Sequence, residues 1–174
     1  TLTYSRTIPA TASRHADWPS WALPSLRAHL REQGITDLYS HQAETARLAR
    51  DGVDVVVATG TSSGKSLGYQ IPILTRLAES PTACGIYLTP TKALGSDQLT
   101  ATSELIRGTP ELAGAGIHPA PYDGDTPTEA RSGIRELSRF VFSNPDMIHA
   151  SVLANHARWA RVLRHLKFIV VDEC

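Results

Sequence analysis

The sequence predicts an α/β fold in which a parallel sheet carries helices on both faces. Short β-branched or apolar runs alternate along the chain with segments of helical periodicity. Several of these runs are continuously apolar, as expected of strands whose two faces are both covered by helices. A glycine-containing loop with a lysine joins the first run to the helical pattern after it. Such alternation predicts parallel strands linked by right-handed crossovers.

Two helices are predicted ahead of this alternating series. Residues 1–19 are polar, contain two prolines and predict an extended N-terminal segment. Beyond them the apolar residues follow helical spacing until Gly34, and Ser40 caps a second short helix that ends at Gly52. We therefore expect one domain over residues 20–174, a length that supports a single full hydrophobic core.

The alternating series itself predicts five strands and the helices between them. The expected strands are residues 53–58, 84–88, 117–122, 140–142 and 167–171. The expected helical segments span residues 65–78, 92–107, 127–137 and 145–163. All strands of such a sheet end at one edge, and ligands of open α/β sheets bind at that edge.

Composition limits the classes of protein to which the chain can belong. Its 17 basic and 17 acidic residues give a formal net charge of zero, so any binding of nucleic acid depends on local placement of Lys and Arg. The apolar runs are too short to cross a membrane. Two cysteines make no disulfide framework and favour a reducing, cytoplasmic location, and the seven histidines lack the spacing of a zinc site. The chain begins without Met, and we expect it to be a piece of a longer protein.

Residues 58–66 read ATGTSSGKS and end in Gly64-Lys65-Ser66, as a phosphate-binding loop does. Thr59 occupies the position at which the usual pattern has Gly. Glycines let the backbone curl around a phosphate, Lys65 would place its ammonium on the β- and γ-phosphates, and Ser66 would offer a hydroxyl to Mg²⁺. We expect nucleotide contacts from the whole loop, namely from Thr59, Gly60, Thr61, Ser62, Ser63, Gly64, Lys65 and Ser66.

Two acidic residues at the end of the last strand complete the predicted nucleotide site. Asp172 and Glu173 directly follow an apolar run. In P-loop ATPases an acid at this position holds Mg²⁺, and a following Glu orients the attacking water. Lys65, Asp172 and Glu173 are therefore the candidate catalytic residues, and Ser66 and Asp172 are the candidate Mg²⁺ ligands. Gln42, ahead of the loop, has an amide that can read one edge of adenine.

Three helices are predicted to begin at the same edge of the sheet. Thr91 precedes one of them, and Asn144 caps another. Thr126 caps the helix between them, with Pro127 at its first position and Glu129 completing a capping box. Free backbone N–H groups and the helix dipole favour phosphates at such ends. A row of these ends predicts a site for a nucleotide together with a phosphate backbone.

These motifs together resemble the first RecA-like domain of a superfamily-two helicase. The matching stretches are LYSHQ, ATGTSSGKS, PTKALGSDQ, YDGDTP, SNPDMIH and the final DEC. This superfamily often has Ala rather than Gly at the first loop position, so Thr59 does not count against the site, and Gln42 matches the glutamine that reads adenine. The variants are similar to the bacterial MrfA/SftH group, which is related to RecQ4-type helicases. DEAD-box RNA helicases fit less well, because they carry Ala-Asp after the Asp-Glu pair.

The resemblance implies ATP-driven translocation on DNA, with 3′ to 5′ polarity and a role in DNA repair. It implies ATP and Mg²⁺ as cofactors, DNA as a partner, and a second RecA-like domain in the same polypeptide, without which we expect this chain to hydrolyse ATP very slowly. Thr91, Lys92, Thr126 and Asn144 would contact the DNA backbone, and helix capping is the alternative role for the threonines and the asparagine. Three other readings stay open: a superfamily-two RNA helicase, a translocase that does not separate strands, and a non-hydrolysing nucleic-acid-binding module.

Overall fold

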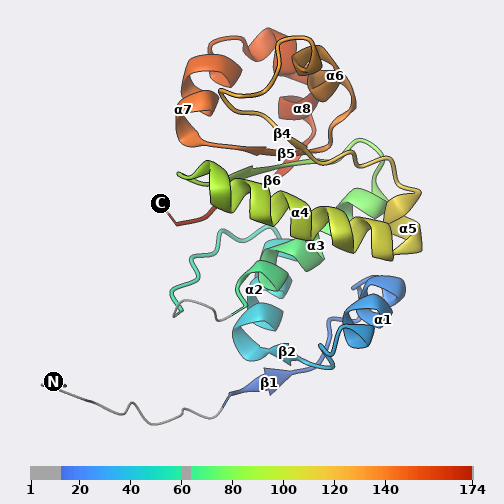
Figure 1. Cartoon of the computed structure of the whole chain (residues 1–174). Coiled ribbons are helices and arrows are strands. Elements are labelled where there is room, and N and C mark those ends of the chain that lie inside the picture. The colour runs from blue at the N-terminus through green and yellow to red at the C-terminus, as the bar shows by residue number, and fades with distance from the viewer. Residues whose placement is uncertain (1–12, 60–63, 174) are drawn as a thin grey trace, which may run out of the picture.

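A four-stranded sheet forms the main layer of the computed structural model, which describes residues 13–59 and 64–173 (Figure 1). The strands follow the order β4-β5-β3-β6 and comprise Ala120–Pro121, Phe140–Ser143, Cys84–Leu88 and Leu166–Val171. Every neighbouring pair is parallel. The predicted α/β fold with a parallel sheet is therefore confirmed.

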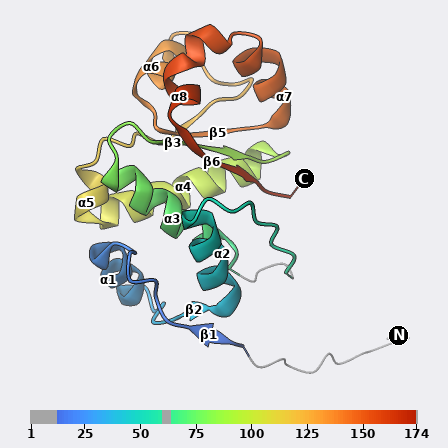
Figure 2. The ribbon, with the colours of Figure 1, turned by 180° about the vertical axis from the view of Figure 1, so that it is seen from behind.

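Helices cover both faces of this sheet (Figures 1 and 2). Neighbouring residues of β3 belong to different hydrophobic clusters, Tyr87 to one and Ile86 to the other. The cluster of Tyr87 contains the buried apolar side chains of α3 (Ser66–Glu79) and of α4 (Lys92–Gly108). The cluster of Ile86 contains the buried side chain of α8 (Ala160–Arg164). The prediction of helices on both sheet faces is thus also confirmed.

The other elements are short. They are α1 (Pro24–Glu32), α2 (Ser40–Arg50), α5 (Pro110–Ala113), α6 (Ala130–Leu137), α7 (Pro145–Met147), the π-helix η1 (Ile148–Leu153) and the 3₁₀-helix η2 (His156–Trp159). A separate antiparallel pair joins β1 (His15–Ala16) to β2 (Leu38–Tyr39). Within the described ranges, no helix combines the length and the hydropathy needed to cross a bilayer.

The residues ahead of the phosphate-binding loop pack on the same core as the sheet. Leu26 of α1 is buried in the cluster that also contains Trp18 and the apolar side chains of α3. Helix α1 contacts α4, and a Cβ at Gly108 would lie 2.1 Å from the ring of His29. Such a distance is far below van der Waals contact, so the glycine permits this close approach of the two helices.

The prediction of a strand over residues 53–58 is wrong, because these residues pair with no strand of the described structure. Val56 is 95% exposed and Val53 is 49% exposed. β-branched residues favour strands, yet a strand is stabilised by its neighbours in the sheet more than by local propensity. Among the described strands β6 pairs with β3 alone, and its residues Ile169 and Val171 are exposed. The segment therefore has the composition of a strand but no partner.

Two boundaries predicted for the middle of the chain are also wrong. The strand expected over residues 117–122 is reduced to the two residues of β4. Helix α6 begins at Ala130 instead of Pro127. Thr126 is not its cap, and Glu129 occupies the N-cap position without a side-chain hydrogen bond, so the predicted capping box does not form.

A closed loop over residues 122–126 explains both differences. The Asp123 carboxylate accepts hydrogen bonds from the backbone N–H groups of Asp125 and Thr126, at 2.9 and 3.1 Å. In return, the Thr126 hydroxyl accepts one from the backbone N–H of Asp123 at 2.9 Å. Side chains of this kind compete with helix and strand for backbone groups. The loop therefore uses the threonine that the sequence pattern assigned to the helix.

Arg139 fastens the N-terminal end of β5 to two other segments. Its guanidinium donates to the carbonyls of Leu77 and Ser80 at the end of α3, at 2.8 and 2.7 Å. It also donates to the carbonyls of Ala115 and Gly116 after α5. The residue is 4% exposed. One buried cation thus satisfies carbonyls from a helix end and from a loop.

Replacing Arg139 by Met would keep an aliphatic stem and remove these hydrogen bonds. We expect the free energy of unfolding to fall by about 3 kcal/mol, because four carbonyls, one buried and three part-buried, lose a charged donor. Urea unfolding monitored by circular dichroism measures the change. Arg164→Met, at an exposed position of α8, is the matched control and should shift stability by less than about 0.5 kcal/mol. Equal stability of the two variants would contradict this role of Arg139.

Candidate nucleotide and nucleic-acid site

The phosphate-binding loop connects the irregular segment after α2 to the start of α3. Lys65 is the residue before α3, and its Nζ donates to the carbonyl of Thr59 at 3.4 Å, so its side chain bridges the two ends of the loop. Gly64 has a φ of +71°, a left-handed conformation that side chains disfavour. The predicted contacts at Gly60, Thr61, Ser62 and Ser63 lie outside the described residues.

Gln42 is placed against this loop. Its Nε2 donates to the Gly64 carbonyl at 2.7 Å, and its Oε1 accepts from the backbone N–H of Tyr39 at 2.8 Å. The side chain is buried. A Cβ added at Gly64 would lie 2.7 Å from that Nε2. The amide therefore ties the start of α2 to the loop, and its contact with adenine stays a prediction.

Asp172 is held at the carboxyl end of β6. Its carboxylate accepts a hydrogen bond from the Tyr87 hydroxyl at 2.6 Å, and its backbone N–H donates to the Leu88 carbonyl at 2.9 Å. Burial and the hydrogen bond to Asp172 raise the pKa of Tyr87, which keeps the phenol protonated as a donor. Tyr87 thus orients the Asp172 carboxylate at the end of β6.

Tyr69 of α3 lies beside Tyr87. Its ring is 5.8 Å from that of Tyr87, and its hydroxyl donates to Gln98 Oε1 at 2.6 Å. Burial raises the pKa of Tyr69, a hydrogen bond with Ser66 opposes this rise, and the charge of Asp172 adds to it. The start of α3 at Ser66 and the end of β6 at Asp172 are about a hundred residues apart in sequence, and both lie near this pair of tyrosines.

These donors suit Mg²⁺, which prefers oxygen ligands. The described residues contain no cluster of three or more His, Cys, Asp or Glu that could hold a metal by itself. Mg²⁺ is commonly bound through one or two carboxylates and completed by phosphates and water. Ser66 and Asp172 therefore fit an ion that arrives with a nucleotide rather than an independent metal centre.

Glu173 follows Asp172 in an unusual backbone conformation. Its φ is +54°, one of two positive values among the described residues other than glycine. Such conformations cost about 1–2 kcal/mol and are found preferentially at functional sites. Its side chain is exposed. The predicted role in orienting water stays a prediction.

A groove beside this site is lined by all four predicted nucleic-acid residues, Thr91, Lys92, Thr126 and Asn144. Its volume is about 430 Å³. The groove runs between the start of α4, the loop 122–126 and the end of β5. Because β3, β5 and β6 are parallel, it opens at the same sheet edge as Asp172. The sequence therefore predicted a set of residues that the fold does assemble.

All four residues already have partners within the chain, Thr126 through its hydrogen bonds with Asp123. The Thr91 hydroxyl accepts from the Leu94 N–H at 3.4 Å and the Asn144 side chain accepts from the Met147 N–H at 2.8 Å, so both are helix caps. Lys92 forms an ion pair with Asp125 at 2.5 Å, which raises the lysine pKa. Capping uses the side-chain oxygen and leaves other backbone N–H groups of the helix end for a phosphate. Their contact with nucleic acid stays a prediction.

Sequence reasoning missed Tyr69, Tyr87 and Asp125. Tyr87 holds Asp172, Tyr69 packs against Tyr87, and Asp125 holds Lys92. Tyr87 could have been found only from the register of the sheet, in which it lies opposite Val170, two residues before Asp172. Asp125 lies in the YDGDTP stretch, whose two acids signal a turn rather than a partner for a lysine.

A family described as DEAD/DEAH box helicase matches residues 39–174, which include the loop, the groove and Asp172. The chain belongs to this helicase family. The match covers the loop, the groove residues and the acid at the end of β6, which are stretches on which the resemblance was based. The MrfA-like and RecQ4-like variants of these motifs agree with the relatives found.

Three relatives illustrate the range of the family. ATP-dependent helicase HRQ1 of Saccharomyces cerevisiae is 46% identical over 167 residues, which are 96% of this chain and 15% of that protein. A crystal structure of the DUF1998 helicase MrfA bound to DNA and AMPPNP has a TM-score of 0.89 at 35% identity, covering 95% of this chain and 23% of that one. Nucleolar RNA helicase 2-B of Xenopus laevis is 31% identical over 153 residues, covering 83% and 18%. The chain spans less than a quarter of each of these relatives.

The contact between Gln42 and Gly64 predicts that a side chain at position 64 destabilises this helicase-family chain. We expect Gly64→Ala to lower the free energy of unfolding by about 2 kcal/mol, since a side chain must adopt a positive φ and also displace the Gln42 amide. In a Gln42→Ala background the same change should lower the free energy of unfolding by about half as much, because only the unfavourable positive φ at residue 64 remains. Urea unfolding of the four proteins in this cycle measures both terms.

Gly133→Ala is the matched control for that cycle. A Cβ at Gly133, inside α6, would meet nothing within 4 Å. Alanine there should leave stability unchanged or raise it by up to about 1 kcal/mol, because it restricts the unfolded chain and favours helix. If Gly64→Ala behaved like Gly133→Ala, the loop geometry described above would be incorrect.

Proposed function

We propose that this chain is the ATP-binding RecA-like domain of an ATP-dependent DNA helicase or translocase. The observation that carries the proposal is the shared sheet edge, where Tyr87 holds Asp172, Tyr69 of α3 packs against Tyr87, and the groove opens beside them. A nucleotide site next to a phosphate-binding groove is the arrangement that an ATP-driven nucleic-acid motor requires. The domain would span residues 20–174 and work with a second RecA-like domain of the same polypeptide.

Each residue of the nucleotide site would have its own role in binding and hydrolysing ATP. Lys65 would bind the β- and γ-phosphates of ATP, and Ser66 and Asp172 would hold Mg²⁺, which neutralises charge that develops on the phosphates. Glu173 would orient the attacking water. Tyr87 would keep the Asp172 carboxylate in place. In related phosphoryl-transfer enzymes an arginine supplied from elsewhere adds several orders of magnitude to the rate. This chain alone should therefore hydrolyse ATP very slowly.

DNA is the favoured substrate because the MrfA structure, 35% identical to this chain, is bound to DNA and AMPPNP. The polarity from 3′ to 5′ and the role in DNA repair rest on the resemblance to the MrfA/SftH and RecQ4-type helicases. RNA is the second candidate, since Nucleolar RNA helicase 2-B of Xenopus laevis is 31% identical. A translocase that does not separate strands and a non-hydrolysing module are the remaining alternatives.

Lys65→Ala in the full-length protein that contains this chain should abolish ATP hydrolysis while the fold stays intact. The ammonium is replaced by a methyl group, so the charge on the phosphates loses its main protein partner. Phosphate release measures turnover, and circular dichroism checks the fold. Lys167→Ala, at an exposed position of β6, is the control and should keep activity. Normal turnover by a folded Lys65→Ala protein would exclude the site assignment.

Matched DNA and RNA duplexes with single-stranded tails separate the remaining alternatives. We expect the full-length protein to unwind DNA that carries a 3′ tail, to need ATP for it, and to leave the RNA duplex paired. Gel separation of the strands is the measurement. Unwinding of RNA alone would favour the RNA-helicase reading, and displacement of a triplex strand without unwinding would favour the translocase. Tight nucleic-acid binding with no ATP hydrolysis would favour the non-hydrolysing module.

A further inference from the structure

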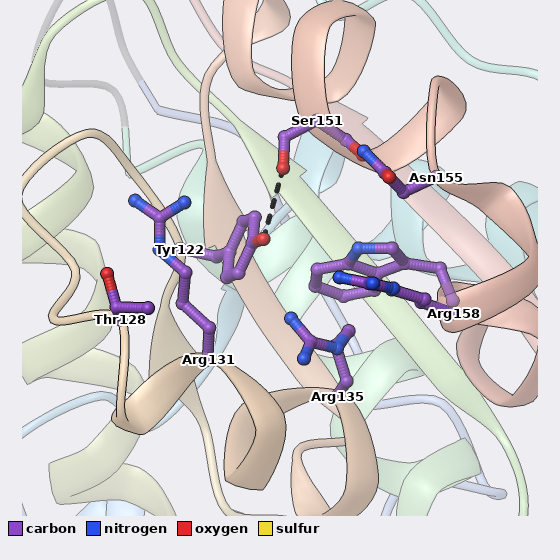
Figure 3. Close-up of a pocket in the computed structure, with 8 residues that line it drawn as sticks. Tyr122, Thr128, Arg131, Arg135, Ser151, Asn155 and Arg158 are labelled. Atoms are coloured by element: carbon purple, nitrogen blue, oxygen red, sulfur yellow. Dashed lines mark hydrogen bonds between the residues drawn. The ribbon is translucent and has the colours of Figure 1, made fainter.

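A second cavity lies next to the loop 122–126, which lines the groove as well, and nothing in the proposed function uses this cavity. Its volume is about 250 Å³. It is lined by Tyr122, Thr128, Arg131, Arg135, Ser151, Asn155, Arg158 and Trp159 (Figure 3). Among these described lining residues there are three arginines and no carboxylate. The cavity is therefore a cationic pocket on a chain whose formal net charge is zero.

The three arginines gather without an acidic partner. None of them forms an ion pair with a described residue, whereas Arg47, Arg50 and Arg76 all do. Arg131 and Arg135 lie four residues apart on α6 and so share a face of the helix. Like charges at this spacing destabilise a helix. Arg158 adds a third positive charge from η2, on the facing wall of the cavity. Such an arrangement is stabilised when an anion is bound.

The remaining walls supply neutral hydrogen-bonding groups on a rigid frame. Ser151 lies on the π-helix η1, and its hydroxyl is 3.1 Å from that of Tyr122 (Figure 3). π-helical turns are rare and occur frequently at functional sites. Asn155 donates to the Ser151 carbonyl at 3.0 Å. Tyr122 and Trp159 are buried and stacked edge to face, so they form the floor of the cavity and offer no face to a base.

These features point to a phosphate group as the ligand. The cavity is smaller than the roughly 300–1,000 Å³ of sites for drug-sized molecules. Guanidinium groups match phosphate oxygens in pairs, and hydroxyl and amide groups complete such sites. An aromatic base has no stacking surface here, because Trp159 is 1% exposed. A phosphate with part of its sugar fits this combination of size, charge and lining.

Arg131 connects this cavity to the groove. Its Nε donates to the Thr126 carbonyl at 3.1 Å and its Nη2 donates to the Asp123 carbonyl at 3.4 Å. Its guanidinium also lies 5.5 Å from the centre of the Tyr122 ring. The loop 122–126 thus contributes Asp123, Asp125 and Thr126 to the groove and Tyr122 to the cationic pocket. A strand that leaves the groove over this loop would meet the pocket next.

We infer that the cationic pocket binds a backbone phosphate of the nucleic-acid strand as the strand leaves the groove. The inference rests on the proposed function, because it extends the path of the same strand. Arg135 and Arg158 hold the phosphate, and Ser151 and Asn155 line its site. Arg131 is a positioning residue, because its hydrogen bonds to the loop 122–126 fix the place of the loop relative to the pocket. Contacts of this kind fix the path of a strand and read no sequence.

The test compares salt-dependent binding of single-stranded DNA by the full-length protein and its Arg135→Gln/Arg158→Gln variant. Neutralising a phosphate contributes about 0.7 to the slope of log K against log salt for a single strand. We expect the variant to lose about that much slope and about fivefold in affinity for a strand of about 16 nucleotides. For a strand of about 4 nucleotides, which fills the groove alone, the variant and the wild type should bind equally.

Controls keep the two proposals separable. Arg164→Gln removes an exposed arginine that does not line the cavity, and it should bind as the wild type does. Arg158→Gln alone changes an exposed side chain, so it preserves the fold if the double variant fails to fold, and it should give a smaller shift in the same direction. A wild type that binds no nucleic acid would overturn the proposed function. A wild type that binds, with slope and affinity unchanged in the variants, would overturn the pocket alone.

One further outcome would replace nucleic acid by a small ligand. In that outcome, inorganic phosphate added during two-dimensional NMR of the wild type shifts the pocket resonances, while the double variant still binds DNA normally. That result would show a phosphate-ion site unconnected with the strand and would overturn the inference. Shifts that disappear when long DNA is bound, together with weaker DNA binding by the variant, would support it.

Discussion

The parallel pairing of β3 with both β5 and β6 is the constraint on which the site depends. It places the carboxyl ends of these strands at one edge, so that Asp172 follows β6 beside Leu88, and Asn144 follows β5 on the other side. In antiparallel strands the corresponding residues would lie at opposite edges. The hydrogen bond from Tyr87 to Asp172 then turns this alignment into a fixed orientation of one carboxylate. The nucleotide site and the groove are neighbours because they share this strand.

The loop 122–126 has a comparable role on the other side of the groove. Its shape is fixed internally by Asp123 and Thr126, and it is connected outward by two cations, Lys92 through Asp125 and Arg131 through two carbonyls. Any movement of the loop would therefore change α4, α6 and both cavities together. This explains in physical terms why a short polar stretch between a strand and a helix carries so much of the candidate interface.

Local signals predicted elements correctly where nothing competes with them, and they were wrong where a competing turn or a distant partner decides. Asn144 before a proline indicates a helix cap, and the structure has that cap. Thr126 before a proline carries the same signal. However, the Thr126 hydroxyl and backbone N–H bond to Asp123 instead, and the helix starts later, at Ala130. The run over residues 53–58 has the composition of a strand, yet pairing requires a partner that composition does not reveal. Tyr87 was missed for the same reason, since its contact depends on sheet register.

The groove and the cationic pocket carry different charges, so they would contribute differently to the binding of a polyanion. Among the described residues that line the groove, Lys92 is the single cationic side chain, and Asp123 and Asp125 lie beside it. The ion pair of Lys92 with Asp125 is exposed and cancels much of that charge, so a phosphate in the groove would be attracted mainly by backbone N–H groups at helix ends. Those groups act at short range, since helix-end effects fall off within a turn. Longer-range attraction must come from cations that are not neutralised locally, and in this chain Arg135 and Arg158 of the cationic pocket meet that condition. A neutral chain can therefore still guide a nucleic-acid strand, provided that its free positive charge lies next to the groove rather than inside it.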